Sequence, residues 1–135
     1  MTGKCFFDSN VWIYLLSDDE PAKKEQAGRL LSEVRQKVVS WQVINEVCVN
    51  LLKKKSKSEA FVRTAFDFIY ESCEVVDFSV PLLETASELR SSHGISFWDS
   101  LIIAAAHAAD CDTIISEDMQ DGRKFERMVV RNIFK

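Results

Sequence analysis

The sequence predicts an α/β fold, with a central, mostly parallel sheet of five strands between two layers of helices (α/β/α). The first observation is that short apolar runs alternate with longer amphipathic runs along the whole chain. Such alternation is typical of parallel sheets covered on both faces. The second observation is the composition, because 47% of the 135 residues are hydrophobic and only four are Gly and two are Pro. We therefore expect one compact domain over residues 1–135.

The individual elements follow from the same patterns. Five short apolar runs predict strands at Lys4–Phe7, Lys37–Ser40, Glu74–Phe78, Thr113–Ser116 and Met128–Arg131. Five amphipathic runs predict helices at Pro21–Gln36, Trp41–Lys55, Ser58–Ser72, Val80–His93 and Phe97–Ala109. Pro21 and Pro81 suit the first turn of the helices in which they fall.

Several classes of protein are disfavoured by the composition. The longest uncharged run, Ser100–Ala109, is too short to span a bilayer, and no N-terminal signal is recognisable, so we expect a cytoplasmic protein without a membrane partner. The four cysteines form no C-x-x-C pair, and His93 and His107 have no H-E-x-x-H spacing. A zinc enzyme or a disulfide scaffold is therefore not expected.

The charge distribution leaves room for a local basic surface only. A net charge of −4 and a pI near 5.2 argue against indiscriminate nucleic-acid binding through a global positive field. Basic residues nevertheless cluster at 53–57 and at 123–131. They either complement the negative end of a helix dipole or contact a phosphate backbone.

Acidic and polar residues follow two of the predicted strands. Asp8 ends the first strand, and Ser116, Glu117 and Asp118 end the fourth, while Asp99 begins the helix that leads into the fourth strand. Ligand sites of parallel sheets lie outside the carboxyl ends of the strands. No glycine-rich phosphate cradle occurs there, so a nucleotide-binding loop is not expected.

These acids have two interpretations. If they converge, their repulsion calls for a cation, and oxygen ligands suit Mg²⁺ or Mn²⁺, which can activate water for attack on a phosphodiester. If they do not converge, Asp8 belongs to a turn, Asp99 closes a Ser96-x-x-Asp99 capping box, and residues 117–121 form a solvated loop.

Glu46 lies opposite the apolar stripe of its helix, so periodicity alone makes it a surface acid.

Four segments together resemble the PIN-domain ribonucleases, and VapC-type toxins in particular. They are FFDSNVWIYLL, WQVINEVCVNLL, HGISFWDSLIIAAA and IISEDMQDG, beginning at residues 6, 41, 93 and 114. They occur in the family's order and extend over essentially the whole chain.

The resemblance implies a PIN-like fold and Mg²⁺- or Mn²⁺-dependent endonuclease cleavage of RNA. By carry-over, Asp8 and Asp99 are the principal metal ligands, and Glu46 and Asp118 complete the catalytic acidic ring directly or through water. Among Glu117, Asp118 and Asp121, the resemblance places Asp118 at the fourth acidic position. The residues that follow the first acid, Ser9 and Asn10, support the site, and Asn10 is a candidate for orienting a carboxylate.

The resemblance also implies partners. Small PIN toxins dimerise and are inhibited by a cognate antitoxin, so we expect an RNA substrate, an antitoxin protein and a homodimer. Two other functions remain open. The DSNVW segment resembles the opening motif of haloacid-dehalogenase-type phosphatases, with Asp8 as nucleophile, although Asn10 replaces their second acid. The other alternative is a non-catalytic domain with a degenerate acidic groove, which binds RNA or a partner protein.

Overall fold

The computed structural model describes residues 3–135, and its centre is one sheet. The strands are β1 (Lys4–Phe7), β2 (Gln36–Ser40), β3 (Glu74–Val76), β4 (Thr113–Ile115), β5 (Lys124–Phe125) and β6 (Met128–Arg131). Their order across the sheet is β3-β2-β1-β4-β6-β5, and every neighbouring pair is parallel except β5–β6. The predicted α/β class is therefore confirmed.

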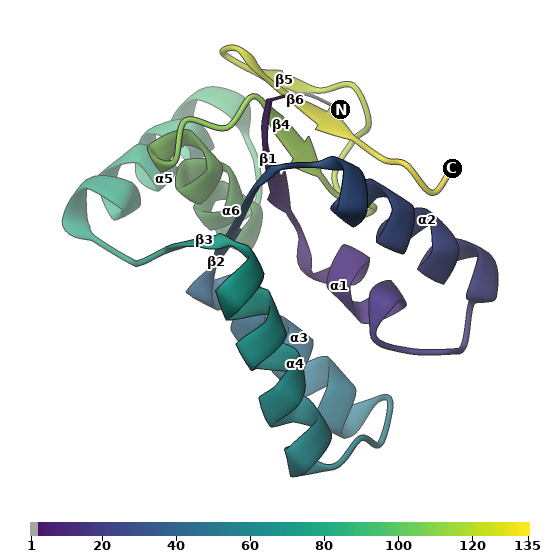
Figure 1. Ribbon diagram of the computed structural model, residues 1–135. Helices are drawn as coiled ribbons and strands as arrows, with labels where there is room; N and C mark the ends of the chain where they lie inside the picture. Colours follow the sequence, from purple (N-terminus) through teal and green to yellow (C-terminus); the bar gives the residue numbers. More distant parts are fainter. Residues whose placement is uncertain (1–2) are drawn as a thin grey trace.

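Six helices surround the sheet: α1 (Ser9–Leu15), α2 (Pro21–Glu33), α3 (Trp41–Lys53), α4 (Glu59–Ser72), α5 (Val80–His93) and α6 (Phe97–Ala108). Figure 1 shows α5 and α6 on one side of the sheet and α1 and α2 on the other, with the α3–α4 pair extending below the strands. None of the helices in residues 3–135 is long and apolar enough to cross a membrane.

Two elements differ from the predictions. The expected number of five strands is wrong, because the described sheet has six: the two-residue strand β5 pairs back on β6 through a tight turn with Glu126 at φ 56°. A run of two residues carries no detectable alternation. Helix α1 was missed because VWIYLL is apolar on every side and lacks the polar face by which an amphipathic helix is recognised. The remaining elements lie within three residues of the predicted bounds.

The winding of the chain places a ligand-binding edge between β1 and β4. The chain adds β2 and β3 on one side of β1 and then crosses over to place β4 on the other side. The two strands stay paired to their ends, where the Asp8 N–H donates to the Ile115 carbonyl at 2.9 Å. In open α/β sheets this change of direction is where ligands bind. The fold therefore brings Asp8 and the residues after β4 to the same point.

Candidate active site at the carboxyl edge of the sheet

Asp8 is the best-defined acid of the site. It follows β1 directly and is the N-cap of α1, where one carboxylate oxygen accepts from the Ser9 N–H at 2.8 Å. The other oxygen accepts from the Ser116 hydroxyl at 2.8 Å. Only 7% of Asp8 is exposed. The carboxylate is therefore held in one orientation, by a helix N-terminus and by the residue that ends β4.

The environment of Asp8 is unfavourable for its negative charge. Burial raises the pKa of Asp8, and the two hydrogen bonds from Ser116 and Ser9 only partly offset that effect. The charges of Asp118 and Asp99 raise this pKa further. No ion pair within residues 3–135 neutralises Asp8. The described residues therefore supply no positively charged side chain that pairs with this carboxylate.

Asp99 lies in the first turn of α6, and its carboxylate is not used as a cap. The Ser96 hydroxyl accepts from the Asp99 N–H at 3.1 Å, which is half of a capping box. The reciprocal bond, from the Ser96 N–H to the Asp99 carboxylate, does not occur in the part of the chain that the structure describes. Asp99 is partly buried and lines a small cavity together with Asp118. Its side chain therefore remains available to a ligand.

Glu46 joins the group from α3. Glu46 is exposed, as the helical periodicity predicts, and lies close enough to the other acids for their charges to act on it. Desolvation raises its pKa, the charge of Asp8 adds to this, a hydrogen bond from Gln42 lowers it, and Asp118 and Asp99 raise it again. Glu46 thus lies at the rim of the acidic site. Helical periodicity correctly predicts that Glu46 is exposed. It does not show that the acids of other elements lie near Glu46.

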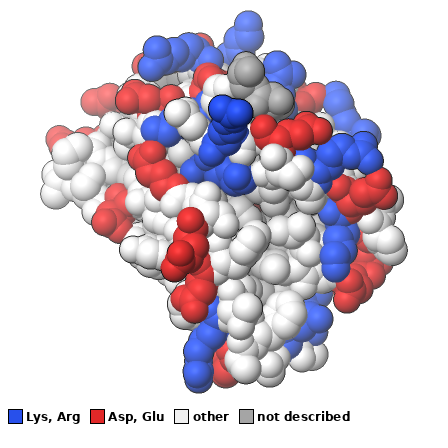
Figure 2. All heavy atoms as spheres, in the orientation of Figure 1, with Lys and Arg blue, Asp and Glu red and all other residues white. Residues whose placement is uncertain are grey.

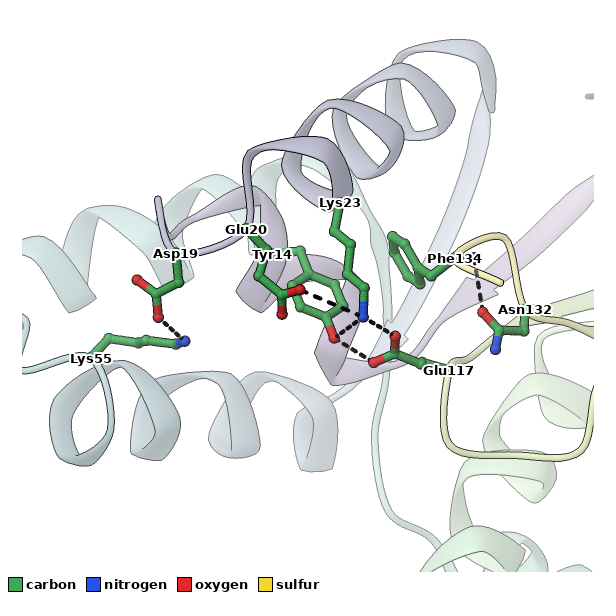
Figure 3. Close-up of polar contacts among 8 residues, drawn as sticks. All are labelled: Tyr14, Asp19, Glu20, Lys23, Lys55, Glu117, Asn132 and Phe134. Carbon is green, nitrogen blue, oxygen red and sulfur yellow. Dashed lines mark hydrogen bonds and ion pairs between the residues drawn. The ribbon is translucent and has the colours of Figure 1, made fainter.

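The loop after β4 contains three acids, and two of them are paired elsewhere. Glu117 accepts hydrogen bonds from Tyr14 and from Lys23, whose ammonium lies 2.6 Å from it, as Figure 3 shows. Burial alone would raise the pKa of Glu117, but these bonds outweigh it and hold the pKa below its usual range. Asp121 is 2.5 Å from Lys135 and accepts from the Asn132 N–H at 2.8 Å. Asp118 has no such partner among the described residues.

The two small polar residues after Asp8 differ in their contacts. Ser9 contributes its backbone N–H to the Asp8 carboxylate. Asn10 makes no hydrogen bond to a carboxylate: both polar atoms of its amide are buried and have no partner among residues 3–135. Buried amides are normally hydrogen-bonded, so an unpartnered one at a site is a place for water or a ligand.

Ser116 is a site residue that the predicted set lacks. It is 1% exposed, donates to Asp8, and its hydroxyl accepts from the Met119 N–H at 3.2 Å. It therefore fixes both the carboxylate and the start of the acidic loop. A polar residue that ends a buried strand was the available signal, but a serine there is also an ordinary strand terminator.

The chemical type of the donor atoms at the site fits a hard divalent cation. It consists of carboxylate oxygens whose mutual repulsion a cation would relieve, and it contains neither Cys nor His. As placed, no group of three acidic, His or Cys side chains within residues 3–135 converges closely enough to enclose a metal ion. Mg²⁺ commonly keeps several waters and takes only one or two carboxylates, so an open arrangement of this kind suits it.

The fold and site together define an α/β protein with a group of acidic residues at the turning point of its sheet. The model of the PIN domain family matches residues 5–128, and the chain belongs to this family. No curated protein sequence matches the chain.

Solved structures confirm the fold. A toxin–antitoxin complex from Klebsiella pneumoniae superimposes with a TM-score of 0.72 at 23% identity, covering 93% of this chain and 96% of that one. VapBC2 from Rickettsia felis, bound to a promoter DNA fragment, gives 0.68 at 19% identity and covers 98% of both chains. The sarcin-ricin loop cleaving toxin VapC20 of Mycobacterium tuberculosis gives 0.69 at 20% identity, with coverages of 85% and 92%.

Proposed function

We propose that the protein is a divalent-metal-dependent endoribonuclease and the toxin of a toxin–antitoxin pair. The observation that carries the proposal is the buried Asp8 carboxylate, which lies within reach of the negative charges of Asp99 and Asp118 and forms no ion pair within residues 3–135. A bound cation would relieve this repulsion, and acids perturbed in this way are typical of functional sites. Membership of the PIN family supports hydrolysis of RNA phosphodiesters as the use of that cation.

In this proposal Asp8 and Asp99 would hold Mg²⁺ or Mn²⁺, and Glu46 and Asp118 would complete the acidic ring directly or through water. The bound ion would lower the pKa of a water molecule and stabilise charge on the phosphodiester in the transition state. Ser116 and the Ser9 N–H keep Asp8 oriented before substrate arrives. Glu46, at the exposed rim and with a raised pKa, is placed to accept a proton from the attacking water.

The structural neighbours support the proposed partners. One is a toxin–antitoxin complex, and another is a toxin that cleaves the sarcin-ricin loop. We extend to this chain an RNA substrate, an antitoxin that inhibits it, and a homodimeric state. PIN membership favours this activity over a haloacid-dehalogenase-type phosphatase. A non-catalytic binding domain differs from the proposal only in the absence of cleavage, which experiment can decide.

The proposal predicts that purified, partner-free protein cuts a mixed RNA pool with Mg²⁺ or Mn²⁺ and does not cut it in EDTA. The measurement is gel analysis of end-labelled RNA over time, with restoration by excess metal as the control for irreversible damage. Hydrolysis of a generic phosphate monoester would instead support the phosphatase. Metal-independent RNA binding without any cleavage would support the binding domain and contradict the nuclease.

A second prediction separates the acids of the loop after β4. We expect Asp118→Asn to lower the cleavage rate by about 10- to 100-fold, the range typical of residues that tune a metal site. Glu117→Gln should leave the rate within about twofold of wild type, because Glu117 is bonded to Lys23 and Tyr14. The measurement is the single-turnover rate at saturating Mg²⁺. A larger loss in Glu117→Gln than in Asp118→Asn would overturn this assignment.

A further inference from the structure

A largely apolar groove begins at Glu46 and extends along α3, away from the other acids. Its volume is about 640 Å³. One wall is the exposed side of α3, and the other contains Phe78, from the connection between β3 and α5, and Trp98, from the first turn of α6. Glu46 belongs both to this groove and to the candidate active site, so the groove adjoins that site.

The groove exposes aromatic side chains that the protein core does not use. Trp98 is 64% exposed and Phe78 is 53% exposed, as is Val49 on the opposite wall. Trp98 makes an edge contact with Phe97, whose ring centroid lies 5.2 Å away at an interplanar angle of 84°. The Trp98 side chain lines the groove and remains largely exposed there. Flat aromatic surfaces of this kind are platforms on which nucleobases stack.

The far end of the groove is positively charged. Lys53 and Lys54, at the end of α3, line it and have no ion pair among residues 3–135. The next lysine along the chain, Lys55, is instead paired with Asp19, as Figure 3 shows. In a chain with net charge −4, unpaired lysines beside an apolar groove favour an anionic ligand. Lys53 lies two helical turns from Glu46, about 10 Å along the helix axis.

We propose that this groove binds single-stranded RNA that flanks the scissile phosphate. Trp98 and Phe78 stack on unpaired bases, and Lys53 and Lys54 contact the phosphates beyond them. The inference rests on the proposed ribonuclease function and specifies its substrate: bases inside a duplex are already stacked and cannot enter the groove. The combination of aromatic surface with unpaired lysines fits a nucleic-acid strand better than an apolar peptide.

The test measures binding of a single-stranded oligoribonucleotide in EDTA, where no cleavage occurs. We expect Trp98→Ala to weaken binding about tenfold, within the range of one base stack, and Trp98→Phe to retain most of the affinity. The double variant Lys53→Gln/Lys54→Gln should lower the slope of log affinity against log salt by about 1.4, the value for two phosphates of a single strand. Tyr70→Ala and Lys124→Gln, exposed residues outside the groove, are matched controls and should bind like wild type.

The proposal is overturned if the groove variants bind single-stranded RNA with wild-type affinity and salt slope. That result is also expected if the groove receives an apolar segment of a partner protein. Wild-type cleavage with Mg²⁺ is measured in parallel, so that the two proposals can fail separately. Cleavage with no effect of the groove variants rejects only the groove, whereas wild type that neither binds nor cuts RNA rejects both.

Discussion

Replacing Asp8 or Asp99 by Asn is expected to lower RNA cleavage by about a thousandfold or more. Each change removes a negative charge but keeps the size of the side chain. At position 8 the amide can still hydrogen-bond with Ser116 and the Ser9 N–H. The loss would therefore come from weaker binding of the cation that stabilises the transition state, and electrostatic effects of this kind are among the largest in catalysis.

The control for this pair is Asp67→Asn, which removes a carboxylate from the exposed surface of α4. Its cleavage rate should equal that of wild type. Circular dichroism and the unfolding midpoint of each variant establish that the fold is retained. Full activity in Asp8→Asn or Asp99→Asn, measured with Mg²⁺ in single turnover, would remove that residue from the metal site.

The same Asp8→Asn change is expected to stabilise the metal-free protein at neutral pH. Burial and the neighbouring acids raise the pKa of Asp8 in the folded state, so that ionising this carboxyl costs the folded protein stability. The folded protein then binds more protons than the unfolded chain, so stability falls as pH rises from about 4 through the folded-state pKa. Asn removes this penalty.

Urea unfolding in EDTA at several pH values measures this effect. The difference between Asp8→Asn and wild type should be small near pH 3.5 and reach its full size once the wild-type carboxyl is ionised. Saturating Mg²⁺ should raise the stability of wild type relative to Asp8→Asn, because a ligand at 100 times its Kd adds about 2.7 kcal/mol to the protein that binds it. As a control, Asp121→Asn should not stabilise, since pairing with Lys135 lowers the pKa of Asp121. A less stable Asp8→Asn protein in EDTA would contradict this account of the site.

Those parts of the fold that depend on periodic burial could be predicted from the sequence. The strands β1 and β6 and the helix α5 have the predicted bounds, because each is delimited by a sharp change of pattern or a cap such as Ser79. Helix α1 and strand β5 could not be found in this way. The first is apolar all round, and the second exists only because β6 is beside it.

The candidate site was predictable to the extent that strand ends share an edge. That rule puts Asp8 and Asp118 at one edge, and Asp99 joins them as a candidate because it begins the helix that leads into β4, whereas Glu46 was proposed only through the PIN resemblance. Side-chain pairing is not visible in sequence. The engagement of Glu117 by Lys23 depends on a contact between α2 and the loop after β4, which are far apart in the chain.

The distribution of charge on the surface also required the structure. Figure 2 shows blue side chains mainly at the top and along the right-hand side, with a largely uncharged surface in the lower centre, over the α3–α4 pair of Figure 1. Two arginines of the basic segment 123–131 make contacts within the protein: Arg127 lies 3.7 Å from Asp110, and Arg123 donates to the His93 carbonyl at 2.8 Å. The segment 53–57 therefore contributes the unpaired lysines that border the groove.

The central claim is that Asp8 and Asp99 hold a divalent cation, and Mn²⁺ binding tests it most directly. The measurement is the decrease in the electron paramagnetic resonance signal of free Mn²⁺ as protein is added. We expect wild type and Glu117→Gln to bind Mn²⁺ alike, Asp8→Asn and Asp99→Asn to lose that binding, and Mg²⁺ to compete for the site. Equal Mn²⁺ binding by wild type and both Asn variants, or none by wild type, would contradict the account.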